Sequence, residues 1–383
     1  MDKINIEINK IGGAILKNHI IIPSILAGLA ASAANAQGSV TLYGILDAYM
    51  ESAHVGGNGA GTGSVQKLTS GGLSPNRWGM RGEEALGGGM KARFVLEGGF
   101  SEDTGIASMG GRLFGRQSTV GLAGPFGEVT FGRRPAPLNG VLARTDIETG
   151  LSAFSPLSAV SVLDTNTGRQ DNHIRYISPR LGGFTGQLSF APGERTVLTN
   201  GLQNNMYGAS LDYRSGPALI SMAYHQAGTS ATSSTTFDTK QRAFVVGGVY
   251  DFNVVRVAAT YWDYTNQLSG RGDPHLRAYA IGASVPLGAW SAMAQIGLVQ
   301  DNGLNLNTGN AKVQGIGRVR YLNVGANYQF SKRTELYTRF ARVQDSGAGY
   351  GGVNTAALAT LALGTLQPGQ SARTIALGVR HYF

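Results

Sequence analysis

The chain has 383 residues, a formal net charge of +9 and no cysteine, and only 14% of its residues are charged. That charged fraction is well below the roughly 25% of an ordinary soluble domain, and no apolar run approaches the ~20 residues that a membrane-spanning helix needs. A disulfide framework is excluded. The apolar residues are scattered among Ser, Thr, Asn and Gln, as in a wall with lipid on one side and water on the other.

The first 36 residues have the organisation of a secretory signal peptide. Three lysines precede an apolar stretch over residues 20–31, and Ala-Asn-Ala at 34–36 has the small-residue pattern of a signal peptidase site. A membrane anchor is the alternative, but the apolar stretch is short and contains Pro23. We therefore expect a signal peptide over 1–36, export, and a single barrel domain over 37–383.

From Ser39 onward, apolar and polar residues alternate with a period of two. The alternation is clear over residues 40–51, 91–97, 184–190 and 322–330. This period is typical of strands with one apolar face. Because soluble sandwiches alternate in the same way, the pattern by itself does not decide between a sandwich and a membrane barrel.

The lengths of the connections favour a membrane barrel. Seven tight turns rich in Gly and Pro, at 86–89, 124–127, 179–183, 215–217, 251–253, 286–288 and 331–333, alternate with longer polar segments. Short turns at one end and long loops at the other are typical of a transmembrane barrel. Seven hairpins with a first strand at about 39–52 and a last strand at about 371–383 predict 16 antiparallel strands. They must close, because lipid tolerates no unpaired backbone, and a barrel of this size encloses an aqueous channel.

The alternation also assigns side chains to the channel interior. The residues expected to line the lumen are all polar: Asp47, Arg93, Glu97, Gln187, Arg256, Asn323 and Arg339. Tyrosines and phenylalanines gather near the strand ends, as aromatic girdles at the membrane interfaces do.

One connection differs from the others. Residues 134–171 form a segment of roughly 38 residues that contains eight large apolar side chains, among them Leu138, Leu142 and Phe154. A structureless loop of this length is uncommon in a compact fold unless it is functional. We expect this third long loop to fold into the lumen, pack on the barrel wall and constrict the channel.

Five segments resemble the general porins of β-proteobacteria: SVTLYGILDAY (39–49), NRWGMRGEEALGGGMKARFVLE (76–97), LFGRQSTVGLAGPFGEVTFGR (113–133), NHIRYISP (172–179) and ALGVRHYF (376–383). The resemblance extends over essentially the whole mature chain. It implies a homotrimer of 16-stranded barrels in the Gram-negative outer membrane, a constricting third loop, passive diffusion of small hydrophilic solutes and ions, and often a preference for anions.

The resemblance also implies roles for individual residues. By motif match, Arg77, Arg116 and Arg175 are expected on the wall at the constriction, facing Asp146 and Glu148 of the third loop. The terminal Phe383 is expected to be the signal that the barrel-assembly machinery reads. Outer-membrane lipid and lipopolysaccharide are the expected surroundings.

Other chemistry lacks its sequence context. The glycine-rich segment 57–63 is not followed by the Lys-Ser/Thr pair of a phosphate loop, and the six histidines show no zinc-binding spacing. No Gly-x-Ser-x-Gly elbow is present. The pI of about 9.7 could indicate nucleic acid, but the basic residues are spread over all strands rather than gathered in a patch. We expect no catalytic residues, cofactor, metal or nucleic-acid partner.

Two alternatives to a general diffusion pore stay open. A channel specific for one solute, such as a sugar or phosphate, would need more aromatic side chains at the constriction than Phe154. A barrel enzyme would need a converging pair such as His173 with a loop acid.

Overall fold

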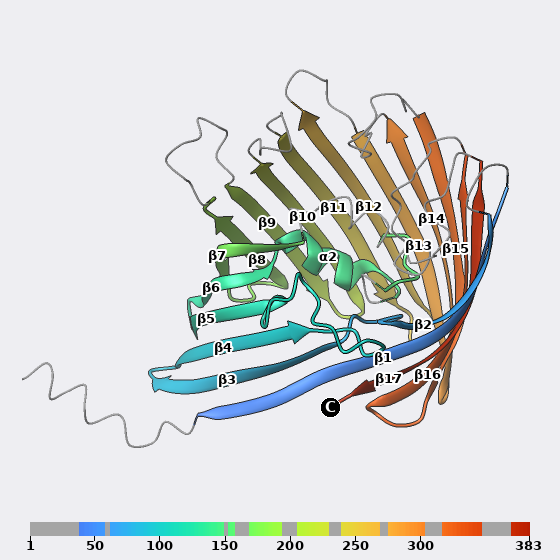
Figure 1. The fold of residues 1–383 in the computed structure, drawn as a ribbon. Coiled ribbons are helices and arrows are strands. Elements are labelled where there is room, and N and C mark those ends of the chain that lie inside the picture. The colour runs from blue at the N-terminus through green and yellow to red at the C-terminus, as the bar shows by residue number, and fades with distance from the viewer. Residues whose placement is uncertain are drawn as a thin grey trace, which may run out of the picture.

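The computed structural model describes residues 38–57, 62–148, 152–157, 168–193, 205–229, 239–268, 275–302, 316–346 and 369–383. The expected signal peptide over 1–36 lies outside these ranges. Nearly all of the described chain is antiparallel sheet, curved into a barrel (Figure 1). No helix in the described part of the chain is long and apolar enough to cross a membrane.

The described residues form seventeen strands. They are β1 (Ser39–Gly56), β2 (Gly63–Ser70), β3 (Arg77–Gly87), β4 (Met90–Gly99), β5 (Gln117–Gly124), β6 (Gly127–Pro135), β7 (Arg169–Ile177), β8 (Phe184–Ala191), β9 (Met206–Ser215), β10 (Ala218–Thr229), β11 (Thr239–Asp251), β12 (Arg256–Leu268), β13 (His275–Leu287), β14 (Trp290–Asn302), β15 (Ile316–Gln329), β16 (Thr334–Asp345) and β17 (Ser371–Tyr382). From β3 onward each strand pairs with the next in the chain, and β17 pairs with β1, so the sheet closes on itself.

The second position of the barrel is shared by two strands. β1 pairs with β2 through residues 48–55 and with β3 through residues 39–45. β2 and β3 are therefore two parts of one interrupted strand, and the seventeen strands occupy sixteen positions around the barrel. The prediction of a closed 16-stranded antiparallel barrel is confirmed, and the interruption at residues 71–76 is a feature that the alternation did not indicate.

The two ends of the barrel differ as the sequence predicted. All seven tight turns join consecutive strands at one end, for example between β3 and β4 and between β13 and β14. The long connections lie at the other end, which is the external end in outer-membrane barrels. We call these the turn end and the loop end.

The period of two separates an apolar outer face from a polar inner face. On β1, Val40, Leu42 and Met50 are more than 60% exposed on the outside, whereas the intervening Asp47 and Tyr49 are almost fully buried inside. Outward apolar side chains face lipid, and inward side chains face the channel or whatever fills it.

The described residues 136–148 and 152–157 of the third loop fill part of that interior. The loop starts with the short helix α2 (Pro137–Thr145), which begins at a proline, a residue suited to the first helical turn. α2 lies within the barrel rather than outside it (Figure 1). The largest buried apolar cluster joins this helix to inward side chains of β10 to β17 and of β1. The prediction that the third loop folds into the lumen and packs on the wall is confirmed for its described residues.

Candidate functional site

The third loop is fixed to the wall by the apolar face of α2. Leu138, Val141 and Leu142 have no exposed surface and pack in one cluster with inward residues such as Ala223 and Val245 of β10 and β11. Burying three side chains of this size contributes about 1.5–3 kcal/mol each. The spacing of the three residues at i, i+3 and i+4 places them on one side of the helix.

Two glycines in the wall allow the loop to approach the strands closely. A Cβ added to Gly247 would lie 2.6 Å from the Cβ of Thr145, and one added to Gly297 would lie 2.3 Å from the Cβ of Pro156. Any side chain at these positions would displace the loop. Glycine inside a strand often marks such a close backbone approach.

After α2, two carboxylates bind the loop to β14, β15 and β16. Asp146 accepts hydrogen bonds from Gln295 Nε2 at 2.6 Å and from the Ser155 hydroxyl. Burial raises the pKa of Asp146 to about 6. Glu148 accepts hydrogen bonds from Asn323 Nδ2 at 3.0 Å and from Arg339 Nε at 2.6 Å.

The Glu148–Arg339 ion pair is almost inaccessible to water, with 2% and 3% of the two side chains exposed. Its attraction is therefore little screened. Among the described residues, no ion pair joins Asp146 or Glu148 to Arg77, Arg116 or Arg175.

The far part of the loop reaches the break between β2 and β3. The Ala153 amide donates to the Gly72 carbonyl at 2.8 Å, and the Phe154 ring meets the Tyr49 ring edge-on with centroids 5.4 Å apart. The described parts of the loop thus run from the end of β6 along the inner wall of β9 to β16 and reach β1 and the break between β2 and β3.

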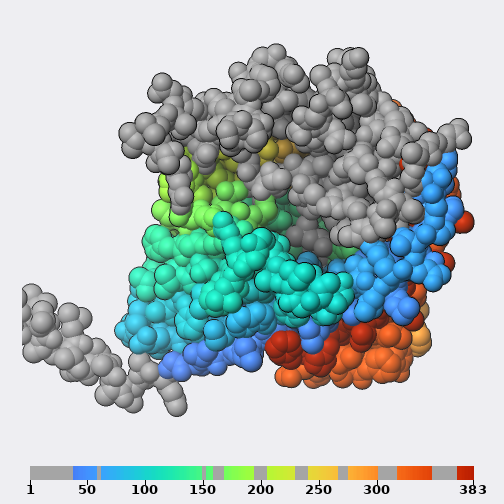
Figure 2. Space-filling model, in the orientation of Figure 1, coloured from blue at the N-terminus to red at the C-terminus, as the bar shows by residue number. Residues whose placement is uncertain are grey.

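Asp47 holds that break in place. Its Oδ2 accepts the backbone amides of Leu73 at 2.8 Å and Ser74 at 2.7 Å, and its Oδ1 accepts the Tyr337 hydroxyl at 2.6 Å. Asp47 is inward-facing with no exposed surface, so its carboxylate is used to satisfy backbone donors where the strand is interrupted. In the space-filling view, the teal segment that joins β4 to β5 lies over this region (Figure 2).

The arc of wall from β3 to β7 carries a cluster of arginines. Arg116, 5% exposed, pairs with Glu97 at 2.7 Å. Arg169 Nε donates to the Arg116 carbonyl at 2.9 Å, and Arg77 Nε donates to the Pro75 carbonyl at 3.0 Å. Arg77, Arg116 and Arg169 are near enough to repel one another electrostatically.

A second part of this cluster lies on β6 and β7. Arg175 pairs with Glu128 at 2.5 Å, and Arg133 pairs with Asp171 at 2.6 Å. Arg134 is buried and donates to the Thr130 hydroxyl at 2.7 Å.

Three arginines of the cluster have no acidic partner. Within the part of the chain that the structure describes, no carboxylate pairs with Arg77, Arg134 or Arg169. The arc from β3 to β7 therefore holds uncompensated positive charge, and the wall contacts of Asp146 and Glu148 lie elsewhere, on β14 to β16.

The remaining residues expected in the lumen lie toward the turn end. Arg93 pairs with Glu83 at 2.8 Å and with Glu128 at 2.9 Å. Arg256 lines a cavity of about 290 Å³ beneath the third loop, together with Arg339 and Arg380.

The sequence did not single out Arg134 or Arg169 because the alternation fails where they lie. The pairing of β6 with β7 shifts register between Gly132 and Arg134, and Asn172 in the facing segment has a φ of 56°. A bulge of this kind re-aims the neighbouring side chains. The adjacent pair Arg133-Arg134 next to a glycine was the available signal.

A metal site, or a catalytic pair with His173, would need His, Asp or Glu side chains that lie close together. Among the described residues, no three His, Asp or Glu side chains converge into a possible metal site. His173 is fully buried, and no described carboxylate hydrogen-bonds to it.

Comparison with known proteins gives a consistent result. The family of Gram-negative porins matches residues 24–348. The outer membrane porin protein 32 of Delftia acidovorans is 32% identical, over 96% of this chain and all of that protein. An outer membrane porin protein of Bordetella pertussis is 28% identical, over 84% of this chain and 93% of the other. Among solved structures, an anion-selective porin from Comamonas acidovorans superposes with a TM-score of 0.74 at 28% identity, covering 91% of this chain and all of that one.

Proposed function

The chain belongs to the Gram-negative porin family, and from that premise we propose that this outer-membrane channel prefers anions because of the arginine cluster on β3 to β7. Passive passage of small hydrophilic solutes is the function of the family. The observation that carries the preference is the absence of described acidic partners for Arg77, Arg134 and Arg169. The similar structure described as anion-selective supports the same sign.

The physical reason is the field inside a narrow channel. Fixed charges in a constriction with low-dielectric walls raise the local concentration of the opposite ion. The Debye length is about 30 Å at 0.01 M salt and about 3 Å at 1 M. Anion preference should therefore be strong in dilute salt and nearly vanish at 1 M.

The constriction is proposed to lie between this cluster and the third loop. Its wall side consists of Arg77, Arg116 and Arg175, as expected from the sequence, joined by Arg134 and Arg169. Its loop side includes Asp146 and Glu148, whose carboxylates are directed to their own side of the wall by Gln295 and Arg339. This leaves the arginine side as the dominant charge.

Reversal potentials in planar bilayers test the proposal. Wild type should be anion-selective at 0.01–0.1 M salt, and R77Q/R134Q/R169Q should lose most of that selectivity while retaining conductance at 1 M. The control R180Q/R214Q/R333Q removes equal charge from exposed residues near the turn end. Cation preference in wild type, or equal losses in the two triple variants, would contradict the proposal.

We also propose a homotrimer inserted by the barrel-assembly machinery, with no cofactor, metal, catalytic role or nucleic-acid partner. Phe383 supports the assembly role through its position in the closing seam. Its amide and carbonyl hydrogen-bond to Gly44 of β1 at 3.2 and 3.1 Å, and its ring covers that glycine. A residue that completes the last pairing is well placed to be recognised before closure.

A further inference from the structure

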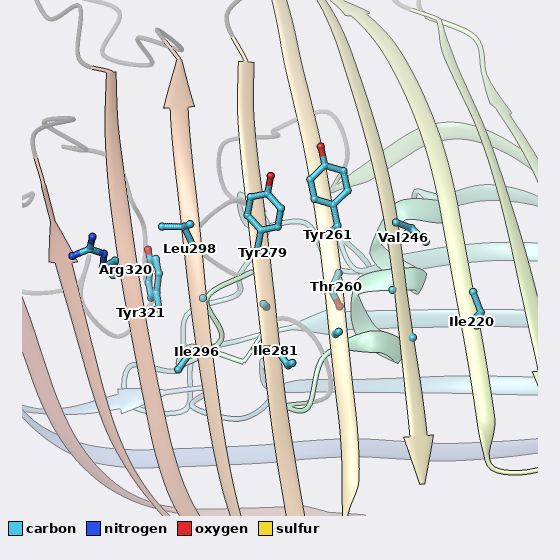
Figure 3. A pocket seen from close by; sticks show the side chains of 15 residues that line it. Ile220, Val246, Thr260, Tyr261, Tyr279, Ile281, Ile296, Leu298, Arg320 and Tyr321 are labelled. Carbon is cyan, nitrogen blue, oxygen red and sulfur yellow. The ribbon is translucent and has the colours of Figure 1, made fainter.

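The hollows in the barrel wall differ in what can reach them. One, of about 830 Å³, lies on the outside of the barrel between Ile220 of β10 and Arg320 of β15 (Figure 3). Its lining includes Ile281 and Ile296, which are half exposed in the outward apolar row, so the bilayer covers it. The cavity of about 290 Å³ beneath the third loop lies on the lumen side, where solutes in the channel can enter it. We call it the turn-end cavity.

The turn-end cavity has a polar row on four neighbouring strands. Arg256 of β12 lies directly opposite Ser284 of β13, and Ser291 of β14 lies directly opposite Asn327 of β15. All four residues line the cavity. On β12, Arg256 is two positions from Ala258, which belongs to a buried cluster inside the barrel, so Arg256 points to the same side. One guanidinium, two hydroxyls and one amide therefore follow the inner wall beneath the third loop.

Arg256 is the arginine of this cavity that is available to a ligand. The neighbouring Arg339 is paired with Glu148, and Arg380 is paired with Glu335. Among the described residues, none accepts a hydrogen bond from Arg256 or forms an ion pair with it. A guanidinium carries five N–H donors and can bind a carboxylate through two of them at once.

A carboxylate lies beside this guanidinium without pairing to it. Asp251 of β11 is directly opposite Arg256 in the register and lines the same cavity. Its Oδ1 accepts the Asn253 amide at 2.8 Å, which closes the tight turn between β11 and β12, and no ion pair joins it to Arg256. Directly opposite residues have Cβ atoms about 4.5–5.5 Å apart. The cavity thus presents a cation and an anion close together that do not neutralise each other by contact.

The rest of the lining is apolar. It consists of Leu73, Ile147, Pro286 and Met293. Ile147 and Met293 also pack with the buried cluster on β10 to β12, so this side of the cavity is held by the third loop. A short aliphatic group in the cavity would be removed from water against these residues. Guanidinium, carboxylate and apolar surface are the complements of the carboxylate, ammonium and side chain of an α-amino acid.

We propose that the turn-end cavity is a binding subsite for zwitterionic α-amino acids with a small aliphatic side chain. Arg256 and the Ser284 hydroxyl bind the carboxylate, and the ammonium donates to Asp251. The side chain lies on Ile147 and Met293. A solute with only one charge would meet one attractive and one repulsive partner. The inference rests on the channel function of the family and not on the proposed anion preference.

The test measures binding of L-leucine to the folded barrel in a planar bilayer, from the current noise that the amino acid adds at rising concentration. Wild type should show saturable noise with L-leucine. It should show little with N-acetyl-L-leucine, which lacks the ammonium, or with L-leucinamide, which lacks the carboxylate. Binding should be weak, because conduction requires a solute that leaves readily. Titration calorimetry of the folded barrel in detergent gives the affinity independently.

Two variants remove one charge each from the subsite. R256Q and D251N should each weaken leucine binding about tenfold or more, because a hydrogen bond between charged groups is lost. Asn at position 251 still accepts the Asn253 amide, so the turn stays closed. R256K keeps the charge without the forked donors and should lose less than R256Q. The controls R333Q, at an exposed turn-end residue, and D103N, at an exposed loop acid, should bind leucine like wild type.

Equal leucine binding by wild type, R256Q and D251N would overturn the proposal, as would the absence of any saturable signal with L-leucine. Equal binding of N-acetyl-L-leucine would show a simple anion site, and equal binding of L-leucinamide a simple cation site, and either result contradicts a zwitterion subsite. R77Q/R134Q/R169Q should lose anion selectivity and still bind leucine, so the two proposals fail separately. If neither charge variant folds, the three ligands on wild type decide the question.

Discussion

The buried Glu148–Arg339 pair should determine whether the third loop stays on the wall. E148Q keeps the shape of the side chain but leaves Arg339, 3% exposed, without its carboxylate. Removing one partner of a buried pair costs about 3–5 kcal/mol. The 2.6 Å Arg339 Nε bond and the 3.0 Å Asn323 bond both end on Glu148 Oε1, so the substitution weakens both. A cost of about 3 kcal/mol corresponds to a change of more than 100-fold in the docked population.

The expected result is a loosened loop in an intact barrel. Single-channel recordings of E148Q should show larger conductance and more current noise, and hydrogen exchange over 146–157 should accelerate while the strands stay protected. D103N, at an exposed acid in the loop between β4 and β5, is the control and should match wild type. E148Q/R339M, which removes both charges, should recover part of the docking. Normal noise and exchange in E148Q would refute the assignment of this pair as the anchor.

Four further outcomes are expected. G297V should displace the third loop by steric clash and raise open-channel noise in bilayer recordings, with the barrel still resistant to SDS before heating. Burial raises the pKa of Asp146 from 3.8 to about 6. The protonated carboxyl therefore favours the docked loop fully below about pH 4, and this contribution, up to about 3 kcal/mol, is lost as the pH rises through 6. Hydrogen exchange over the loop should accelerate from pH 4 to 7.5 in wild type and not in D146N. V324R, on the lipid face, should destabilise the barrel by about 2–4 kcal/mol in denaturant titrations from vesicles, and Q187R on the lumen side should cost far less. Deletion of Phe383 should lower the yield of heat-modifiable barrel without blocking export, which fractionation by compartment would show.

The local alternation of apolar and polar residues was sufficient to predict the barrel, because each strand has one face toward lipid and one toward the lumen. Leu46 is exposed and Asp47 buried as the alternation on β1 requires, and the turns are marked by glycine and proline. The same logic indicated a third loop inside the lumen, because its apolar residues needed a surface to pack on.

The sequence could not predict contacts that join distant segments or break the period. Glu148 and Arg339 are 191 residues apart, and nothing local marks them as partners. The break at residues 71–76 depends on Asp47 of β1, whose carboxylate accepts the backbone amides of Leu73 and Ser74 within the break. Arg134 follows a register shift, so the period-two rule gives no reliable side for it.

The proposed narrowing of the channel and its proposed anion preference have a common origin in the way the third loop packs. Docking the loop places Glu148 against Arg339 and Asp146 among the neutral donors Gln295 and Ser155. The loop carboxylates are thereby neutralised or shielded on their own side of the lumen. The arc from β3 to β7 receives no such compensation for Arg77, Arg134 and Arg169 from the described residues. In the proposed constriction, a loop that occupies the lumen and pairs its own acids with its own side of the wall leaves the arginines as the facing charge. A variant that releases the loop should therefore widen the channel and weaken its anion preference together.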